Sequence, residues 1–141
     1  VGEYGTYARI VDWDQLPNGL LGITIEGHEP FYVQSVWREP SGLVRAEVAW
    51  RDIPETMELP DTFVGLAEVL EGLLRHPQIQ RLQLDSDLTD GWRVGNQLAQ
   101  LLPIDEGLKY QLQGLTSVVQ LLEEMDNILV ELSGESDQTG R

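Results

Sequence analysis

Residues 8–23 read Ala-Arg-Ile-Val-Asp-Trp-Asp-Gln-Leu-Pro-Asn-Gly-Leu-Leu-Gly-Ile, and this stretch decides the fold. Its Asn18-Gly19 pair supplies the positive φ angles that a tight hairpin turn requires. Beyond the turn, apolar residues at positions 21, 23 and 25 alternate with smaller or polar ones. This period of two is typical of a strand with one buried and one solvated face, so the stretch predicts a β-hairpin.

The same period continues outward from the hairpin as far as Trp50. Gly27-His28-Glu29 and Pro40-Ser41-Gly42 interrupt it, and both are rich in residues that favour turns. The first half of the chain therefore predicts an antiparallel meander of four strands, which we place at Tyr7–Asp12, residues 21–25, Phe31–Trp37 and Leu43–Trp50.

After Asp61 the apolar residues recur with a helical period. We expect a first helix that is capped by Asp61 or Thr62 and stopped at His76-Pro77. Three more helices are expected at residues 90–102, 106–113 and 117–132, and residues 133–141 should form a disordered tail. Strands followed by helices predict the α+β class.

Charge and composition exclude several functions. The 141 residues include 24 acidic and 9 basic ones, which gives a net charge of −15, and the arginines are scattered singly. Nucleic acid and anionic membranes are therefore poor partners. The chain has no cysteine, which excludes disulfides and thiolate metal sites and fits a cytoplasmic protein. No apolar run reaches the ~18 residues that span a bilayer.

The motifs of common enzymes are missing, so we expect no catalytic residue, no cofactor and no metal. Lys109 stands outside any phosphate-binding loop and is read as a solvated or capping residue. His76 is read as a cation at a helix C-terminus, and His28 has no nucleophile motif to pair with. The acidic tract at residues 85–91 misses the spacing of a calcium loop, which predicts a polar loop that ends in a helix cap.

Aromatic side chains suggest where binding takes place. Trp50 and Trp92 are expected in the core, which is the usual place for large aromatics. Strict alternation along residues 31–38 places Phe31 and Val33 inward, and it leaves an outward strip that a peptide could occupy unless a helix covers it. The predicted substrate-binding residues are Trp13, Tyr32, Val36 and Trp37.

Three stretches in order resemble the Lon substrate-binding (N-terminal) domain family. The first is residues 8–23, with its Leu-Pro-Asn-Gly turn. The second is residues 92–103, a helix that leads to Leu-Leu-Pro, and the third is the Lys-Tyr-Gln-Leu run at residues 109–112. Gly27 and Phe31 also fit the family pattern, whereas Pro30 stands where an arginine is expected.

The resemblance implies a PUA-like antiparallel β pseudo-barrel followed by a C-terminal helical bundle. On this basis, residues 1–58 form the β-rich part of the domain, residues 59–132 form its helical part, and residues 133–141 form the tail. The strands that open the family domain are expected to be missing here. The ATPase and peptidase parts of Lon are expected to be absent as well, as in a stand-alone or excised domain.

The function implied is non-catalytic recognition of unfolded or tagged proteins, linked to ATP-dependent proteolysis. Protein or peptide substrates are the expected partners, with a protease or a chaperone as a further candidate, and the oligomeric state stays open. Two alternatives remain at this point. One is an enzyme with an unrecognised pocket, and the other is a PUA-like RNA-binding module, which a contiguous basic face would favour.

Overall fold

The computed structural model describes residues 2–52 and 56–139, with the backbone alone for residues 135–139. The described part divides into two compact units, a sheet unit (Val1–Pro54) and a helical unit (Glu55–Arg141). Strands precede helices, so the α+β prediction is confirmed. The elements in order are β1 (Tyr4–Gln15), β2 (Leu21–Arg38), β3 (Val44–Trp50), η1 (Asp61–Phe63), α1 (Val64–Leu74), α2 (Pro77–Gln80), α3 (Gly91–Leu101), α4 (Glu106–Gln113) and α5 (Val118–Thr139).

The sheet has three antiparallel strands in the order β1-β2-β3, not the four that were predicted. The predicted turn at Gly27-His28-Glu29 is wrong, because β2 continues through it and Gly27 pairs with Ala8 of β1. The described glycines with positive φ are Gly19 and Gly42, at the two real hairpin turns. Gly27 is not in this left-handed region and stays paired with β1. The second and third predicted strands are therefore one long strand, β2.

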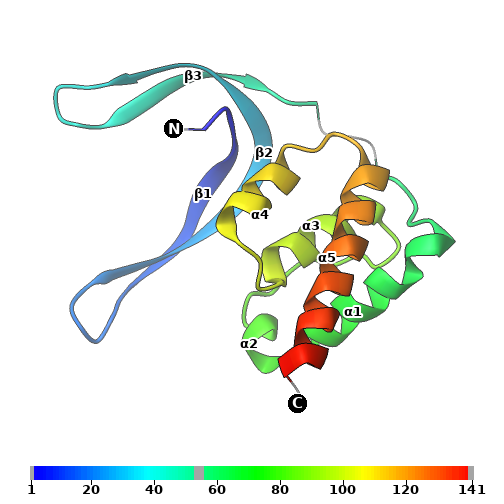
Figure 1. Ribbon diagram of the computed structural model, residues 1–141. Helices are drawn as coiled ribbons and strands as arrows, with labels where there is room; N and C mark the ends of the chain where they lie inside the picture. Colours follow the sequence, from blue (N-terminus) through cyan, green and yellow to red (C-terminus); the bar gives the residue numbers. More distant parts are fainter. Residues whose placement is uncertain (1, 53–55, 140–141) are drawn as a thin grey trace. The chain divides into compact units, whose positions relative to one another are not determined.

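The sheet is three strands wide only in its middle. Phe31 of β2 lies opposite Gly5 on one side and Trp50 on the other, and Tyr32 is likewise paired on both sides. Away from these residues the sheet splits into two two-stranded ribbons. A β1–β2 ribbon ends at Gly19 and a β2–β3 ribbon ends at Gly42 (Figure 1). Along most of its length, therefore, β2 has a neighbour on one side only.

Register shifts decide which side chains share a face. A shift between Val33 and Ser35 breaks the strict alternation of β2. Across a bulge two residues oppose one, so Val36 returns to the side of Phe31 while Trp37 falls on the side of Tyr32. We name the two sides the Trp13 face, which also holds Tyr32 and Trp37, and the Trp50 face, which also holds Phe31, Val33 and Val36. The prediction that Tyr32 and Val36 form one strip is therefore wrong.

Apolar side chains change face from one ribbon to the other. In the β1–β2 ribbon they occupy the Trp13 face, where the register aligns Ile10 with Ile25 and Trp13 with Ile23. In the β2–β3 ribbon they occupy the Trp50 face, where it aligns Phe31 with Trp50, Val33 with Val48 and Val36 with Ala46. Within residues 2–52 no side chain is fully buried.

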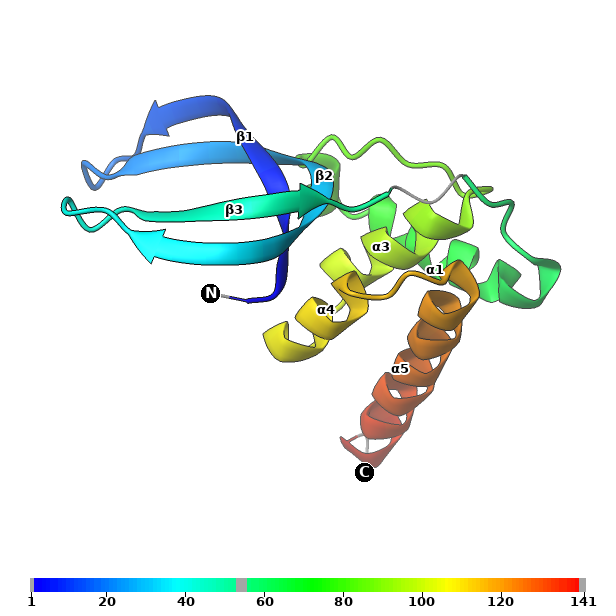
Figure 2. The same ribbon diagram turned by 90° about the horizontal axis from the view of Figure 1, so that it is seen from above.

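The helical unit, in contrast, encloses a core. Its fully buried side chains come from α1, α3 and α5, which pack together (Figure 1, Figure 2). The helices α3 and α5 approach closely at Gly95, where an added Cβ would lie 2.6 Å from Leu121 Cδ2. The largest of its fully buried side chains are Leu66, Leu70, Val94, Leu98, Leu121, Leu122 and Met125.

Most predicted helices are confirmed, with corrections at their ends. The helices α3 and α4 begin and end within a residue of the predicted bounds. Asp61 and Thr62 do not cap α1, because they lie in the preceding 3₁₀ turn η1. Phe63 stands at the N-cap of α1, and its side chain accepts no hydrogen bond there. The expected tail is helical through Thr139, because extending an existing helix costs far less than starting one. None of the helices in the described ranges is long and apolar enough to cross a bilayer.

Candidate functional site

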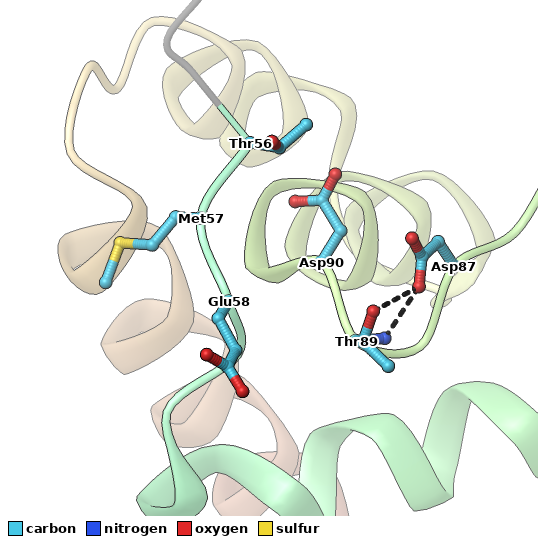
Figure 3. Close-up of a pocket in the computed structure, with 6 residues that line it drawn as sticks. All are labelled: Thr56, Met57, Glu58, Asp87, Thr89 and Asp90. Carbon is cyan, nitrogen blue, oxygen red and sulfur yellow. Dashed lines mark hydrogen bonds between the residues drawn. The ribbon is translucent and has the colours of Figure 1, made fainter.

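An acidic cleft lies in the helical unit, where residues 56–58 run beside the loop that precedes α3 (Figure 3). Its volume is about 280 Å³. Backbone hydrogen bonds join the two segments, from Leu59 N to the Thr89 carbonyl (2.7 Å) and from Gly91 N to the Met57 carbonyl (2.8 Å). The cleft is lined by Thr56, Met57, Glu58, Asp87, Thr89 and Asp90.

The two aspartates of this cleft have local structural roles. Asp87 Oδ1 accepts hydrogen bonds from the Thr89 hydroxyl (2.6 Å) and the Thr89 backbone N–H (2.9 Å). Both hydrogen bonds lower the pKa of Asp87 below its ordinary value, and the bond from the hydroxyl has the larger effect. Asp90 caps α3, because its Oδ1 accepts from Trp92 N at 3.0 Å. The prediction of a polar loop that ends in a helix cap is confirmed.

The carboxylates of this cleft do not converge on a common point. In Figure 3 the Glu58 carboxylate points away from that of Asp90, and Asp87 points toward Thr89. No group of three or more potential metal ligands exists among residues 2–52 and 56–134. Asp90 is further engaged by Arg93, whose Nε lies 3.9 Å from its Oδ2. We therefore interpret the cleft as the groove between two loop segments that run side by side, and we do not assign it a function.

The lysine and histidine candidates also have structural partners. Lys109 Nζ donates to the Gln100 carbonyl near the end of α3 at 3.1 Å, which confirms its reading as a capping residue. His76 directly follows the C-cap of α1, and its Nδ1 accepts a hydrogen bond from Gln78 N at 3.3 Å, which makes it also the N-cap of α2. Its reading as a cation stays a prediction. His28 Nε2 lies 3.0 Å from Glu26 Oε1.

The predicted binding residues are exposed but do not form one cluster. Trp13 is 69% exposed, and Tyr32, Val36 and Trp37 are each 44–45% exposed. Trp13 pairs with Ile23 in the β1–β2 ribbon, whereas Trp37 pairs with Arg45 in the β2–β3 ribbon. Val36 lies on the opposite face from the other three. The structure thus divides the predicted set between two ribbons and two faces.

An aromatic cluster on the Trp50 face escaped the sequence analysis. Trp50 was expected in the core but is 60% exposed. Its ring lies edge-on to Tyr7 and to Phe31, with centroid distances of 6.1 Å in both pairs. Tyr7 in turn contacts the His28 ring at 5.9 Å. Only the register of the three strands could have revealed this grouping.

Arginine side chains in both units have local partners. Arg45 pairs with Glu39 at 3.1 Å. Arg51 lies over the rings of Tyr4 and Tyr32, on the Trp13 face, with centroid distances of 5.8 and 5.2 Å. In the helical unit Arg93 Nη1 lies 2.9 Å from the carboxylate of Asp85, and this hydrogen bond raises the pKa of Arg93. The described arginines are thus distributed singly and most are engaged locally.

The chain was compared with family models, curated proteins and solved structures, and similarity was found to solved structures. No family model matches the sequence, and no curated protein matches it. Among solved structures, the chain is similar to the Lon N-terminal domain protein from Xanthomonas campestris, with 32% sequence identity and a TM-score of 0.72 over 88% of this chain. This match spans 66% of the Xanthomonas chain.

A second solved structure shares the fold. The N-terminal domain of the Mycobacterium avium complex Lon protease gives a TM-score of 0.60 at 18% identity, over 89% of this chain and 68% of that one. The first match adds 32% sequence identity to the shared fold. The chain therefore belongs to the Lon N-terminal domain family.

Proposed function

We propose that this chain is a non-catalytic domain that binds unfolded or tagged protein segments in Lon-type, ATP-dependent proteolysis. The family membership supports a role beside a protease, and the compartment we propose is the cytoplasm. Residues 1–58 and 59–132 would act as the β-rich and helical parts of one binding domain. Trp13, Tyr32, Val36 and Trp37 are proposed as contacts to the bound segment.

The observation that carries this proposal is the exposed apolar surface of the sheet unit. Of the large hydrophobic side chains that are exposed, fifteen lie in the sheet unit and five in the helical unit. Apolar surface on this scale usually marks an interaction site. The open edges of the ribbons offer unpaired backbone groups as well, so an extended segment could pair with an edge and place alternate side chains on a face.

We further propose that the sheet forms part of a PUA-like pseudo-barrel. The bulges between Thr6 and Ala8 and between Ile10 and Asp12 support this, because bulges curve a strand and are frequent in barrels. The length of β2, which serves both ribbons, also fits a closed or partly closed barrel wall.

The two alternative functions receive less support. An enzyme needs convergent polar groups with perturbed pKa values in a pocket, whereas the shifted groups among the described residues are paired locally, Asp87 with Thr89 and Arg93 with Asp85. An RNA-binding module needs a contiguous basic face. The sheet unit instead carries eight acidic and four basic residues, and the helical unit carries sixteen and five.

Hydrogen exchange in the presence of casein, a natively unfolded protein, tests the proposal. We expect slower exchange on β2, including residues 31–38, because a bound segment shields the strand that serves both ribbons. Replacing Trp13 and Trp37 together with alanine should weaken casein binding by about tenfold, the loss expected for aromatic anchors. Val130→Ala, at a 72% exposed position of α5, is the matched control and should bind as the wild type does.

Two results would contradict the proposal. Protection confined to the helices would place the binding surface outside the sheet unit. Unchanged binding by the double tryptophan variant, together with unchanged exchange on β2, would mean that the apolar faces of the sheet unit do not bind clients.

A further inference from the structure

A cleft on the Trp50 face combines aromatic walls with an unpaired carboxylate. It has a volume of about 580 Å³ and is lined by Tyr7, Glu29 and Trp50, one residue from each strand. The Tyr7 and Trp50 rings stand at 81° to each other, so they form two walls at nearly a right angle. Both rings are exposed, at 44% and 60%, and their faces are therefore accessible to a ligand.

A second layer of contacts holds these walls in place. The Phe31 ring lies edge-on against Trp50 at 82°, and it fills the space above Gly5, where an added Cβ would lie 3.0 Å from the ring. On the other wall, Tyr7 contacts His28, and the Glu26 carboxylate holds the His28 ring at 3.0 Å. Both walls are thus positioned before any ligand arrives.

The third lining residue has no such engagement. The Glu29 carboxylate is exposed and forms no hydrogen bond or ion pair with any residue in the described ranges. Its neighbour Glu26 is the one that pairs with His28. Arg51, which follows Trp50 in sequence, lies over tyrosine rings on the Trp13 face and does not reach this cleft. A negative charge therefore remains available beside two aromatic walls.

We propose that this cleft binds a lysine or arginine side chain of an unfolded client segment. The faces of tyrosine and tryptophan rings attract a cation, and their apolar surface accepts the aliphatic stem that carries it. Glu29 adds the opposite charge, and the net charge of −15 favours a basic client as a whole. The inference rests on the proposed function and specifies which client residues the Trp50 face selects.

The arrangement around Arg51 gives an internal parallel. That guanidinium lies 5.8 Å from the Tyr4 ring centroid and 5.2 Å from the Tyr32 ring centroid, within the range of cation–π contacts. The sheet thus already holds one cation between two aromatic rings on the Trp13 face. The cleft on the Trp50 face presents the same chemistry, with a free carboxylate and space for a cation from outside.

The test uses the full chain and two short labelled peptides, whose binding is measured by fluorescence anisotropy. One is an unstructured peptide in which apolar residues flank a single lysine, and the other has this lysine acetylated. We expect the lysine peptide to bind about fivefold to tenfold more tightly, because acetylation removes both the cation–π contact and the ion pair. Glu29→Gln should remove most of that difference and leave binding of the acetylated peptide unchanged.

Glu47→Gln is the matched control. It removes one negative charge from an exposed position of β3 on the Trp13 face, so general attraction to an acidic protein would fall equally in both variants. Trp50→Leu provides a second variant and should also reduce the preference for lysine. Circular dichroism of each variant checks that the sheet is retained, as expected for exposed positions.

The outcomes separate the two hypotheses. If neither peptide binds the wild type, the proposed function fails and this inference fails with it. If both peptides bind equally, or if Glu29→Gln and Glu47→Gln reduce the lysine preference to the same extent, peptide binding stands and the lysine–arginine cleft is overturned.

Discussion

The sheet unit and the helical unit differ in how far they bury their apolar side chains. Every fully buried hydrophobic side chain of the described residues belongs to the helical unit, whereas the sheet unit buries none completely. Buried apolar area is the main favourable term in folding, so the helical unit holds most of the stability. The difference teaches that the strands leave their apolar side chains exposed, which is what the proposed binding role requires, while the helices enclose an interior of their own.

The largest effect that tests this comparison comes from truncating one large apolar side chain to alanine in each unit. Leu121→Ala should lower the free energy of unfolding by about 3 kcal/mol, because Leu121 is fully buried between α3 and α5 and leaves a cavity. Ile25→Ala, at a 60% exposed position of β2, should cost about 1 kcal/mol or less. Urea denaturation measures both, and equal losses would contradict the comparison.

Two glycines of the helical unit, Gly95 and Gly72, differ in the space around their Cα atoms. An added Cβ at Gly95 would lie 2.6 and 2.8 Å from atoms of buried Leu121, whereas one at Gly72 would meet nothing within 4 Å. Alanine favours a helix over glycine by roughly 0.5–1 kcal/mol. Gly72→Ala should therefore raise stability by about that amount. Gly95→Ala should lower it by about 1–2 kcal/mol through overpacking.

Thermal unfolding followed by circular dichroism separates these two changes. The melting temperature should rise for Gly72→Ala and fall for Gly95→Ala. A rise in both variants would mean that α3 and α5 can move apart without cost.

The smallest expected effect concerns pH and the loop before α3. The Thr89 hydrogen bonds lower the pKa of Asp87, so they stabilise the fold above the unfolded pKa of about 3.9. That contribution is lost as the pH falls through the lowered folded value. Asp87→Asn should therefore be slightly less stable than the wild type at neutral pH, and the two should converge in acid.

Urea midpoints at neutral and acidic pH measure this convergence. Thr89→Val serves as the control, because it removes the hydroxyl donor and should weaken the pH dependence while keeping Asp87. A constant offset between Asp87→Asn and the wild type at all pH values would show that the charge of Asp87 has no part in the effect.

Local signals in the sequence predicted the bounds of α3 and α4 well, but they missed the short helix α2. The bounds of α4 follow from Asp105, whose side chain accepts from Leu108 N, and from Gly114 at the other end. The start of α3 follows from Asp90 in the same way. Each of these ends depends on residues a few positions apart, so a single sequence contains the information.

The sheet depended on information that a single sequence does not contain. Gly27-His28-Glu29 has the composition of a turn, but pairing with β1 keeps it extended. The bulge between Val33 and Ser35 then moved Val36 to the other face, against strict alternation. For the same reason the Tyr7–Glu29–Trp50 cleft could not be foreseen, because its residues meet only through the register of three strands.

The narrow middle of the sheet also sets how the strands open. Phe31 and Tyr32 are paired with strands on both sides, whereas the residues toward Gly19 and Gly42 are paired on one side only. Opening free energies in native proteins differ from segment to segment. Each ribbon can therefore fray from its own tip while the centre stays closed. Amide protons should therefore exchange fastest near Gly19 and Gly42 and slowest at the centre, and a change that loosens one ribbon should leave exchange in the other unaffected.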